Sequence, residues 1–344
     1  MSADDLPLLD FDELAFAGGQ PAGQARIKQR FEDFQVDEVL GFEPTGSGEH
    51  RYLKIRKQDM GTTQVASMLA ERLGTDLSSI GYSGMKDRRA VCTQWFSVPD
   101  KAAQYLTASD LGSPFVELLE TRNNDRKLKI GSHRANRFLL RLRAFSGDFD
   151  DLQARIEHVK AAGVPNYFGP QRLGRAMSNV TQAQDYFRTF DETREGIRLS
   201  RKKRSMLLSA SRSYLFNVIL SKRVTDSSWD RLLAGEVLNL DGTGRFFKAQ
   251  SDQELQSRLA ALDIHPTGLL AGKVRDGDPY TASEAVAKLE AAVLSAYPRL
   301  CAGLSALGVA AARRSLRLMP RNLEYKFDKN ENSVLLSFML PAGG

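Results

Sequence analysis

Strand-type segments at both ends of the chain enclose a long helical middle, and this arrangement limits the possible folds more than any other feature. Alternating and β-branched stretches, with one clear helix among them, fill residues 34–147. Helical periodicity dominates from Gly163 to about Ala312, and strand patterns return after that residue. The sequence therefore predicts a sheet domain, residues 1–162 and 313–344, that carries an inserted, largely helical domain, residues 163–312.

Shorter patterns give local expectations within this plan. The glycine-rich residues 41–49 are typical of a hairpin loop, and residues 126–130 read as a strand. The segment that starts at Thr62 predicts a helix with Thr62 or Thr63 as its N-cap and Gly74 as its end. A second hairpin is expected over residues 240–250.

Positive charge is concentrated in two segments of this 344-residue chain. Residues 121–143 carry a net charge of +7 and residues 198–223 a net charge of +8, whereas the whole chain carries +6. The remainder is therefore net −9, so the basic segments stand out from an acidic body. A polyanion such as a nucleic acid is one explanation. A solvated helix face is the alternative for either segment alone.

Several classes of site find little support in the sequence. The four histidines are scattered without metal-ligand spacing, and no P-loop or GxSxG motif is present. The two cysteines, Cys92 and Cys301, form no CxxC pattern, and Cys92 lies within an apolar strand pattern. The acidic N-terminal residues do not resemble a secretory signal, and no apolar run approaches the length of a membrane span. We therefore expect a cytoplasmic protein that does not enter membranes.

The stretch GYSGMKDRRAVCTQWFSV, residues 81–98, surrounds Asp87 with Lys86, Arg88 and Arg89. Neighbouring cations favour the ionised carboxylate, which is the form that acts as a nucleophile. A structural ion pair in a loop would have the same composition. From these residues alone, the ion pair is the more common case and the catalytic aspartate is the alternative.

This stretch resembles the G-x-K-D-[KR]-x-A-x-T-x-Q-W motif of the TruD family of tRNA pseudouridine synthases. Further segments resemble motifs of the same family in the same order. They are EDFQVDEVLGFEPTGSGEH, KLKIGSHRANRFLLRLR, GVPNYFGPQRLG, LSASRSYLFN and FMLPAGG. The similarity extends over nearly the whole chain.

The resemblance implies an enzyme that isomerises uridine to pseudouridine without a cofactor, at uridine 13 in the D-arm region of tRNA. It also implies an α+β architecture: a mixed, mainly antiparallel sheet with flanking helices that holds the catalytic cleft and bears a family-specific insertion. A monomer is the family expectation. Two alternatives remain open: an RNA-binding module without catalysis, and an enzyme that binds a phosphorylated small molecule through the cationic pocket.

The resemblance also assigns roles to individual residues. Asp87 takes the position of the catalytic aspartate, and Lys28 that of a basic residue that pairs with it; a surface lysine is the alternative. Phe34 and Phe138 correspond to aromatics of the uracil pocket, and Asn136 to a base-contacting asparagine. For Phe34, a place in the core of a strand is the alternative.

Weaker expectations concern contacts with RNA outside the pocket. In the NYFGPQR motif the side chains could form a hinge, an RNA-facing loop or a packing corner between domains. The basic start of the helix near residue 201 could contact phosphates. The residues concerned are Lys86, Arg88, Tyr167, Phe168, Gln171, Arg172, Arg201, Lys202, Lys203, Arg204 and Arg212.

One departure from the family pattern lies at the C-terminal end of the sequence. The family motif continues beyond its glycine with a Ser-Phe segment whose phenylalanine forms one side of a sandwich around the base. The sequence given ends at Gly343 and Gly344. We expect this side of the sandwich to be absent or to be supplied by another residue.

Overall fold

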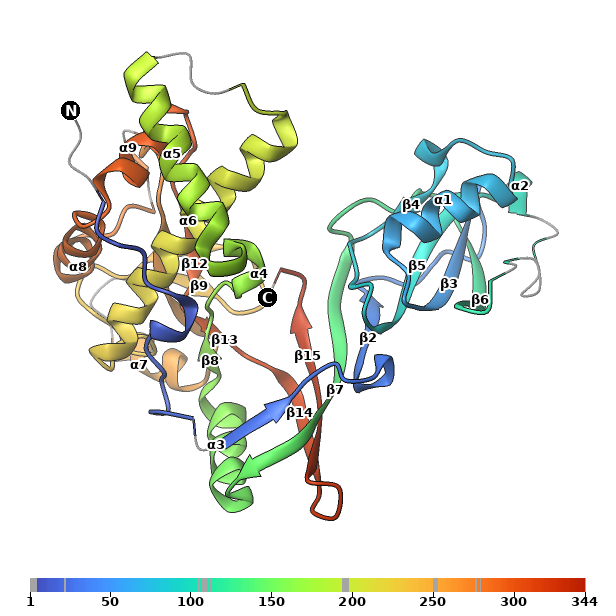
Figure 1. Cartoon of the computed structure of the whole chain (residues 1–344), viewed down its shortest axis with the longest axis horizontal. Helices are drawn as coiled ribbons and strands as arrows, with labels where there is room; N and C mark the ends of the chain where they lie inside the picture. The colour runs from blue at the N-terminus through green and yellow to red at the C-terminus, as the bar shows by residue number, and fades with distance from the viewer. Residues whose placement is uncertain are drawn as a thin grey trace. The chain divides into compact units, whose positions relative to one another are not determined.

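The computed structural model describes residues 5–21, 23–103, 106, 111, 113–193, 198–249, 253–275, 277–278 and 280–343. The chain forms two compact units (Figure 1). Unit 1 combines Met1–Pro21 with Ala161–Met319, and unit 2 combines Ala22–Lys160 with Pro320–Gly344. Both units are therefore built from two separate pieces of chain. The division into a catalytic domain, residues 1–162 and 313–344, and an inserted domain, residues 163–312, stays a prediction.

Unit 2 is built around one large sheet. Its strands are β1 (Gly23–Arg26), β2 (Phe34–Leu40), β3 (His50–Gln58), β4 (Gly81–Tyr82), β5 (Val91–Pro99), β6 (Val116–Asn124), β7 (His133–Gly147), β14 (Arg321–Asp328) and β15 (Ser333–Pro341). The main order is β14-β15-β7-β2-β5-β3-β6, with β1 beside β7 and β4 beside β5. Within the described residues, β2 and β5 run parallel and the other neighbours run antiparallel. The expected mixed, mainly antiparallel sheet is confirmed.

The expected hairpin over residues 41–49 is wrong. Strand β5 lies between β2 and β3, so the two strands that this loop joins are not neighbours. Thr45 N donates instead to the Asn124 side chain, and Gly46 N donates to Asn123 O, at the end of β6. The glycine-rich composition correctly indicated a turn, but composition carries no information on which strands pair.

Helix α1 (Thr62–Arg72) covers one face of this sheet (Figure 1). Its apolar positions, among them Val65 and Leu69, pack against Leu53 and Phe96 of the strands. Burial of each such side chain contributes about 1.5–3 kcal/mol. Unit 2 also contains η2 (Phe31–Asp33), η3 (Leu77–Ser79), α2 (Asp100–Ala103) and α3 (Phe149–Ala162).

The expected threonine N-cap of α1 is wrong, because Gly61 takes that position and Thr62 is the first helical residue. The Thr62 hydroxyl donates to Gln94 Oε1 at 2.8 Å and accepts from Lys86 N at 2.9 Å. The hydroxyl group therefore connects the helix start to the loop that contains Asp87 rather than capping the helix.

The expected strand over residues 126–130 is also wrong. This segment is a loop whose polar backbone groups bond to side chains: Tyr52 Oη donates to Arg126 O, and Leu128 N donates to Ser97 Oγ. Such bonds replace a strand partner. Gly131 N donates to Ser83 O at 2.7 Å and thereby attaches the end of this loop to the segment before Asp87.

Unit 1 is largely helical, as expected, and also contains small sheets. Its helices are η1 (Phe11–Glu13), α4 (Pro170–Leu173), η5 (Arg175–Met177), α5 (Ser178–Thr193), α6 (Arg201–Thr225), α7 (Gln253–Ala260), α8 (Glu284–Leu294) and α9 (Pro298–Ala306). Its strands are β8 (Val164–Pro165), β9 (Val237–Leu240), β10 (Phe246–Lys248), β11 (Ile264–Leu270), β12 (Ala312–Ser315) and β13 (Arg317–Leu318). Strands β9 and β10 pair antiparallel, which confirms the hairpin expected there.

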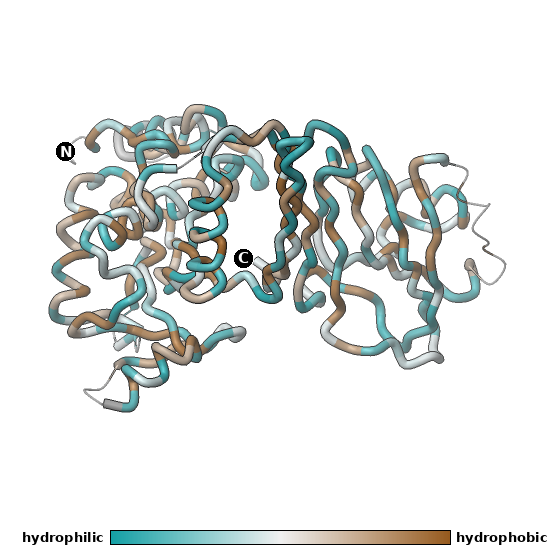
Figure 2. Tube along the Cα trace, turned by 90° about the horizontal axis from the view of Figure 1, so that it is seen from below, coloured by the Kyte–Doolittle hydropathy of each residue, from teal (hydrophilic) through white to brown (hydrophobic). Residues whose placement is uncertain are grey.

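The buried core of unit 1 lies between α5, α6 and α9, where Phe187, Leu215 and Leu300 are fully buried. Figure 2 shows hydrophilic and hydrophobic residues interleaved along the chain. Among the described residues, no helix has the length and apolar character needed to cross a membrane.

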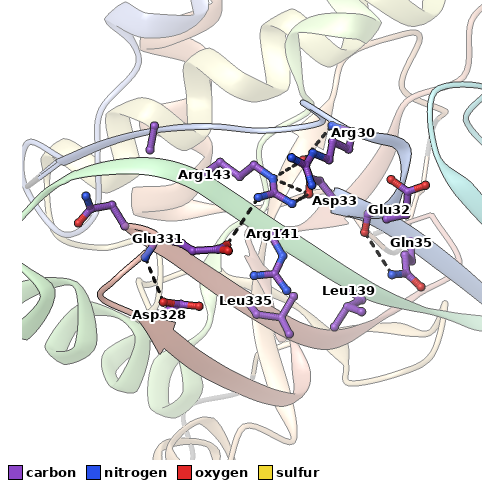
Figure 3. A pocket seen from close by; sticks show the side chains of 12 residues that line it. Arg30, Glu32, Asp33, Gln35, Leu139, Arg141, Arg143, Asp328, Glu331 and Leu335 are labelled. Carbon is purple, nitrogen blue, oxygen red and sulfur yellow. Dashed lines mark hydrogen bonds and ion pairs between the residues drawn. The ribbon is translucent and has the colours of Figure 1, made fainter.

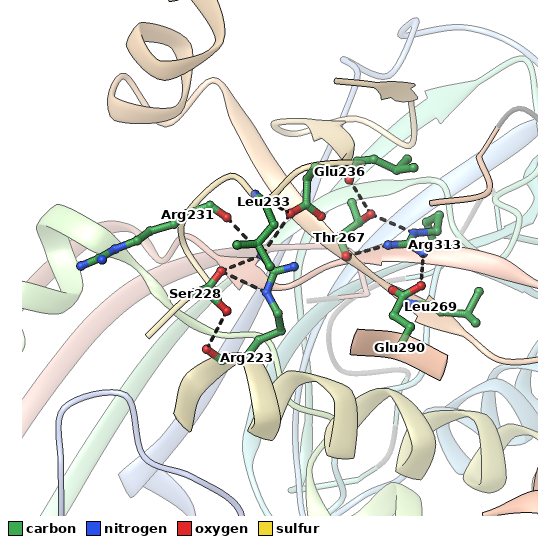
Figure 4. A network of polar contacts seen from close by, with 10 residues as sticks. Arg223, Ser228, Arg231, Leu233, Glu236, Thr267, Leu269, Glu290 and Arg313 are labelled. Carbon is green, nitrogen blue, oxygen red and sulfur yellow. Dashed lines mark hydrogen bonds and ion pairs between the residues drawn. The ribbon is translucent and has the colours of Figure 1, made fainter. Parts of the chain in front are cut away.

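A network of buried charges crosses unit 1 (Figure 4). Arg223 of α6 donates to Ser228 O, Arg231 O and Glu236 Oε2, and the Arg223 and Glu236 side chains are 1% and 0% exposed. Arg313 of β12 similarly contacts Glu290 at 2.9 Å. These pairs tie α6 and α8 to the small sheet.

Candidate active site

The pairing of the strands in unit 2 places a row of side chains across one face of the sheet. Directly opposed residues of neighbouring strands lie on the same face. From β3 to β15, the row is Lys57, Cys92, Val36, Phe138 and Phe338. Phe34 lies two residues before Val36 on the same face, and both Phe34 and Phe138 pack against buried Val36 and Cys92.

Aromatic rings form the outer part of this row. The ring centroids of Phe34 and Phe138 are 6.0 Å apart, and those of Phe138 and Phe338 are 5.3 Å apart with the planes 21° from parallel. All three rings are only partly buried, so they present an apolar surface that a planar base could stack upon. Phe338 was not among the predicted residues. The composition of residues 333–340 predicted a strand, but it could not predict that this strand pairs with β7 and so places Phe338 beside Phe138.

Lys28 connects the Asp87 carboxylate to the first of these rings. Lys28 Nζ is 2.5 Å from Asp87 Oδ2 and 4.0 Å from the centroid of the Phe34 ring. The two side chains are 29% and 41% exposed, so the pair is open to solvent. Lys28 has a left-handed backbone with φ of 53°, a conformation that is uncommon for residues with a Cβ and is often found at functional sites. The structure therefore brings the predicted carboxylate, its basic partner and the aromatics together.

The loop that contains Asp87 is anchored by a second, buried ion pair. Lys86 Nζ is 2.8 Å from Glu38 Oε2, and the two side chains are 4% and 0% exposed. Glu38 Oε1 also accepts from Trp95 N, and Gln94 Nε2 donates to Gly84 O. Because breaking a buried pair leaves an uncompensated charge, this arrangement holds the loop in one place.

Asn136 and His133 form the polar end of the site. Glu38 and Leu340 lie directly opposite Asn136 in the sheet, and Asn136 Nδ2 is 3.4 Å from His133 Nε2. Within the described part of the chain, the buried Oδ1 of Asn136 accepts no hydrogen bond. A buried amide oxygen without a donor is costly, so this atom is available to a ligand.

The electrostatics of this corner keep the imidazole of His133 uncharged. Burial lowers the pKa of His133, and the charge of Lys86 lowers it further. A Cβ at Gly84 would lie 3.0 Å from His133 Cε1 and 3.6 Å from Lys86 Nζ. Glycine at this position therefore allows the loop to approach the imidazole and the ammonium group closely.

The opposite face of the same sheet contains an open hollow of about 830 Å³ (Figure 3). Figure 3 shows Arg143 directed at Asp33, and both carboxylate oxygens of Asp33 accept from Arg143 Nε at 2.8 and 2.9 Å. Asp33 Oδ2 also accepts from Arg30 N. Since Asp33 directly precedes Phe34, this pair fixes the backbone that presents the Phe34 ring.

Burial alone would raise the pKa of Asp33, but the hydrogen bonds from Arg143 and Arg30 hold it below its usual value. The positive charges of Arg143 and Arg141 act in the same direction. The carboxylate is therefore ionised under neutral conditions and keeps its contacts with Arg143.

The weaker RNA contacts expected in the Asp87 loop fall into different environments. Lys86 is buried against Glu38, so a phosphate cannot reach its ammonium without breaking that pair. Arg88 is exposed and contacts Asp59 at 3.0 Å.

The NYFGPQR motif forms a packed corner within unit 1. Tyr167 Oη donates to Ala15 O, and burial raises the pKa of Tyr167 to about 12. Phe168 packs against Phe216, and the guanidinium of Arg314 lies 4.2 Å from the centroid of its ring. Of the motif's remaining predicted residues, Gln171 and Arg172 are exposed, and Arg172 donates to Ser209.

Helix α6 begins with a basic turn. Its N-cap is Ser200, which accepts from Lys203 N, and no acidic residue lies in the first turn. Arg201, Lys202 and Arg204 are exposed, and Lys203 is partly exposed. Arg212 lies farther along the helix and donates to Leu270 O, Ala271 O and Ala310 O, so its role in the structure is to bind backbone carbonyls.

Metal ligands were not predicted from the sequence. Among the described residues, the side chains of histidine, cysteine, aspartate and glutamate form no group of three or more that could hold a metal ion.

Comparisons with known proteins agree on a single family. The family model described as tRNA pseudouridine synthase D (TruD) matches residues 12–183 and 176–344. A tRNA pseudouridine synthase D of Methylococcus capsulatus is 42% identical over 334 residues, 97% of this chain and 92% of that protein. A tRNA pseudouridine synthase D of Hydrogenovibrio crunogenus is 35% identical over 335 residues, 97% of this chain and 94% of that protein.

A solved structure from Methanosarcina mazei, assigned to tRNA pseudouridine synthase D (TruD), superposes with a TM-score of 0.72. The match covers 96% of this chain and 93% of that chain at 18% sequence identity. At this identity the likeness shows the fold alone, and it confirms the fold expected from the sequence.

Proposed function

The chain belongs to the TruD family of tRNA pseudouridine synthases, which isomerise uridine in tRNA, and we propose that Asp87 initiates this reaction at uridine 13 of the D-arm region. The observation that carries the role of Asp87 is its pairing: a partly exposed carboxylate held by Lys28, whose ammonium group lies over Phe34, the first of three neighbouring phenylalanine rings.

The reaction moves one glycosidic bond. The bond between N1 of uracil and C1′ of the ribose breaks, the base turns within the pocket, and a bond between C5 and C1′ forms. The proton on C5 is lost to a base, and N1 ends the reaction carrying a proton, so atoms and charge balance. Since nothing is oxidised or reduced, the reaction needs no redox cofactor, and we propose that it proceeds without any cofactor.

In this proposal, Asp87 starts the cleavage of the bond to N1. Attack on the sugar, attack on the base and removal of a proton are each compatible with a carboxylate at this place. Lys28 holds the carboxylate by its charge and hydrogen bond, and its contact with Phe34 fixes the lysine side chain in turn.

The surrounding groups bind the base. A uridine within folded RNA must leave its stack before C1′ can be reached, which costs a few kcal/mol. Stacking on Phe34 and Phe138 would return about 1–3 kcal/mol per base. The Oδ1 of Asn136, which lacks a donor in the described structure, would accept from the N3–H of uracil.

Exposed basic residues would hold the phosphates of the tRNA. Four positive charges at the start of α6 oppose the helix dipole, and bound phosphates would relieve this repulsion. The proposal includes Arg88, the exposed Gln171 and Arg172, and the basic turn of α6, and it assigns the buried Lys86 and the carbonyl-bonded Arg212 to structural roles. Tyr167 and Phe168 shape the corner that presents Arg172. We further propose a cytoplasmic monomer.

The test is to map pseudouridine in tRNA after incubation with the wild-type chain and with Asp87→Asn. The wild type should release tritium from 5-tritiated uridine in tRNA and produce pseudouridine at position 13. Asp87→Asn should form none while its affinity for tRNA stays within about threefold, because phosphate contacts dominate binding. Substantial turnover by Asp87→Asn would rule out this carboxylate, and binding without tritium release by the wild type would favour an RNA-binding module.

A further inference from the structure

A second lysine lies behind the proposed catalytic loop. Lys57 of β3 is fully buried, with an exposed fraction of 0%. It lies directly opposite Cys92 in the sheet and starts the row of side chains that leads to Phe138. Lysine is among the residues least often buried in proteins, so its presence here calls for a physical reason.

The hydrogen bonds of Lys57 lead to the backbone of the site. Its Nζ donates to Met60 O at 2.6 Å and to Asp87 O at 3.0 Å. The Asp87 carbonyl also accepts from Cys92 Sγ at 3.5 Å. Two buried side chains thus bind the main-chain oxygen of the residue whose carboxylate faces Lys28.

Burial makes this arrangement costly. Transfer of an ammonium group from water into a protein interior disfavours its charged form, and burial accordingly lowers the pKa of Lys57. An apolar side chain of similar length would avoid this cost. The carbonyl groups of Met60 and Asp87 would then lose their donor, and the Asp87 loop would lose its attachment to β3.

We propose that Lys57 is a positioning residue that fixes the backbone of Asp87 and thereby aims its carboxylate. Lys28 contacts the carboxylate from the open side, and Lys57 holds the main chain from the buried side. The aiming role depends on the proposed function of Asp87, whereas the anchoring of the loop does not.

The anchoring is tested with trypsin. The loop offers cleavage sites after the exposed Arg88 and Arg89. The native protein is incubated with trypsin, and mass spectrometry measures the rate of cleavage at these bonds. In Lys57→Met this rate should be about tenfold higher than in the wild type, because two hydrogen bonds no longer oppose local opening of the loop. The matched control is Lys54→Met on the same strand, whose ammonium contacts Glu120 and the Trp95 ring. It should leave cleavage at these bonds unchanged.

The aiming role is tested with single-turnover kinetics on saturating tRNA. Lys57→Met should lower the rate about 100-fold, as expected for a small misplacement of a reacting group, while the dissociation constant for tRNA changes less than about threefold. Lys57→Gln keeps one donor and should lie between Lys57→Met and the wild type in both assays. This variant also serves if Lys57→Met fails to fold.

A double-mutant cycle separates aiming from simple stabilisation. If Lys28 and Lys57 both act through Asp87, the combined loss of rate in Lys28→Met/Lys57→Met will be smaller than the product of the single losses. Independent effects would multiply and would overturn the aiming role. Unchanged cleavage after Arg88 and Arg89 in both Lys57 variants would overturn the anchoring. An inactive wild type would refute the proposed function, and the trypsin assay would still decide the anchoring.

Discussion

The ion pairs of unit 1 and the ion pair of the candidate active site differ in their access to solvent. Arg223 and Glu236 are 1% and 0% exposed, and Arg313 and Glu290 are 2% and 8% exposed. Lys28 and Asp87 are 29% and 41% exposed. The buried pairs bond to backbone groups on several sides, whereas the Lys28–Asp87 pair is open to solvent and Lys28 lies over the Phe34 ring.

This difference separates charges that are enclosed in the fold from a carboxylate that a substrate could reach. Burial raises the pKa of Glu236, and Arg223 opposes this rise, so the pair depends on both partners. Removing one partner of a buried pair leaves an uncompensated charge, whereas an exposed pair contributes little to stability. Mutations in the two regions should therefore affect different properties.

The largest effect on stability is expected for Arg223→Met. Loss of the guanidinium leaves Glu236 buried without its partner, and the free energy of unfolding should fall by about 3–5 kcal/mol. The loss should grow as the pH rises above the usual pKa of glutamate, 4.5, because the carboxyl then ionises in the unfolded chain, whereas burial without Arg223 keeps it protonated in the folded chain. Denaturant unfolding of the whole chain measures the change. The rate of pseudouridine formation per folded molecule should match the wild type. A lower rate without a loss of stability would contradict the view that this buried pair serves stability alone.

The opposite pattern is expected for Lys28→Met. The pair with Asp87 is partly exposed, so the free energy of unfolding should change by less than about 1 kcal/mol. If Asp87 initiates the reaction as proposed, the rate of pseudouridine formation should fall about 100-fold, because its carboxylate loses a charge-assisted contact. Single-turnover kinetics and denaturant unfolding of the same preparation measure both. Lys54→Met provides the control for loss of a surface charge.

A smaller effect is expected for Phe338→Leu, which keeps an apolar side chain but removes the ring stacked on Phe138. If the row of rings binds the base, the KM for tRNA should rise about tenfold, since base stacking contributes about 1–3 kcal/mol. Phe327→Leu, at the opposite end of the β14–β15 hairpin, is the matched control and should leave KM unchanged. Equal KM values for both variants would remove Phe338 from the base-binding surface.

These residues also show how far the sequence could predict the site. Asp87, Lys28 and Asn136 were nominated because their segments resemble motifs of the family; from residue types alone, Asp87 was more commonly a structural ion pair. Lys57 and Phe338 contribute through strand pairing, which brings together residues far apart in the chain. Periodicity indicates the faces of a strand but not its neighbours, and for the same reason the loop between β2 and β3 was mistaken for a hairpin.

The smallest effect concerns Asp33, which supports Phe34 from the opposite face of the sheet. Its pKa in the folded chain lies below the usual 3.8, so its contribution to stability is complete above that pH and is lost as the pH falls through the folded pKa. Asp33→Asn should therefore lower the free energy of unfolding by on the order of 1 kcal/mol near neutral pH, through the loss of the ionic contact with Arg143. The difference from the wild type should shrink as the pH falls below 3.8, because the wild-type carboxyl then takes up a proton. Denaturant unfolding across this pH range measures the difference. If the difference in free energy of unfolding stayed constant over this pH range, the charge of Asp33 would not contribute to its contact with Arg143. The position of Phe34 would then not depend on an ion pair.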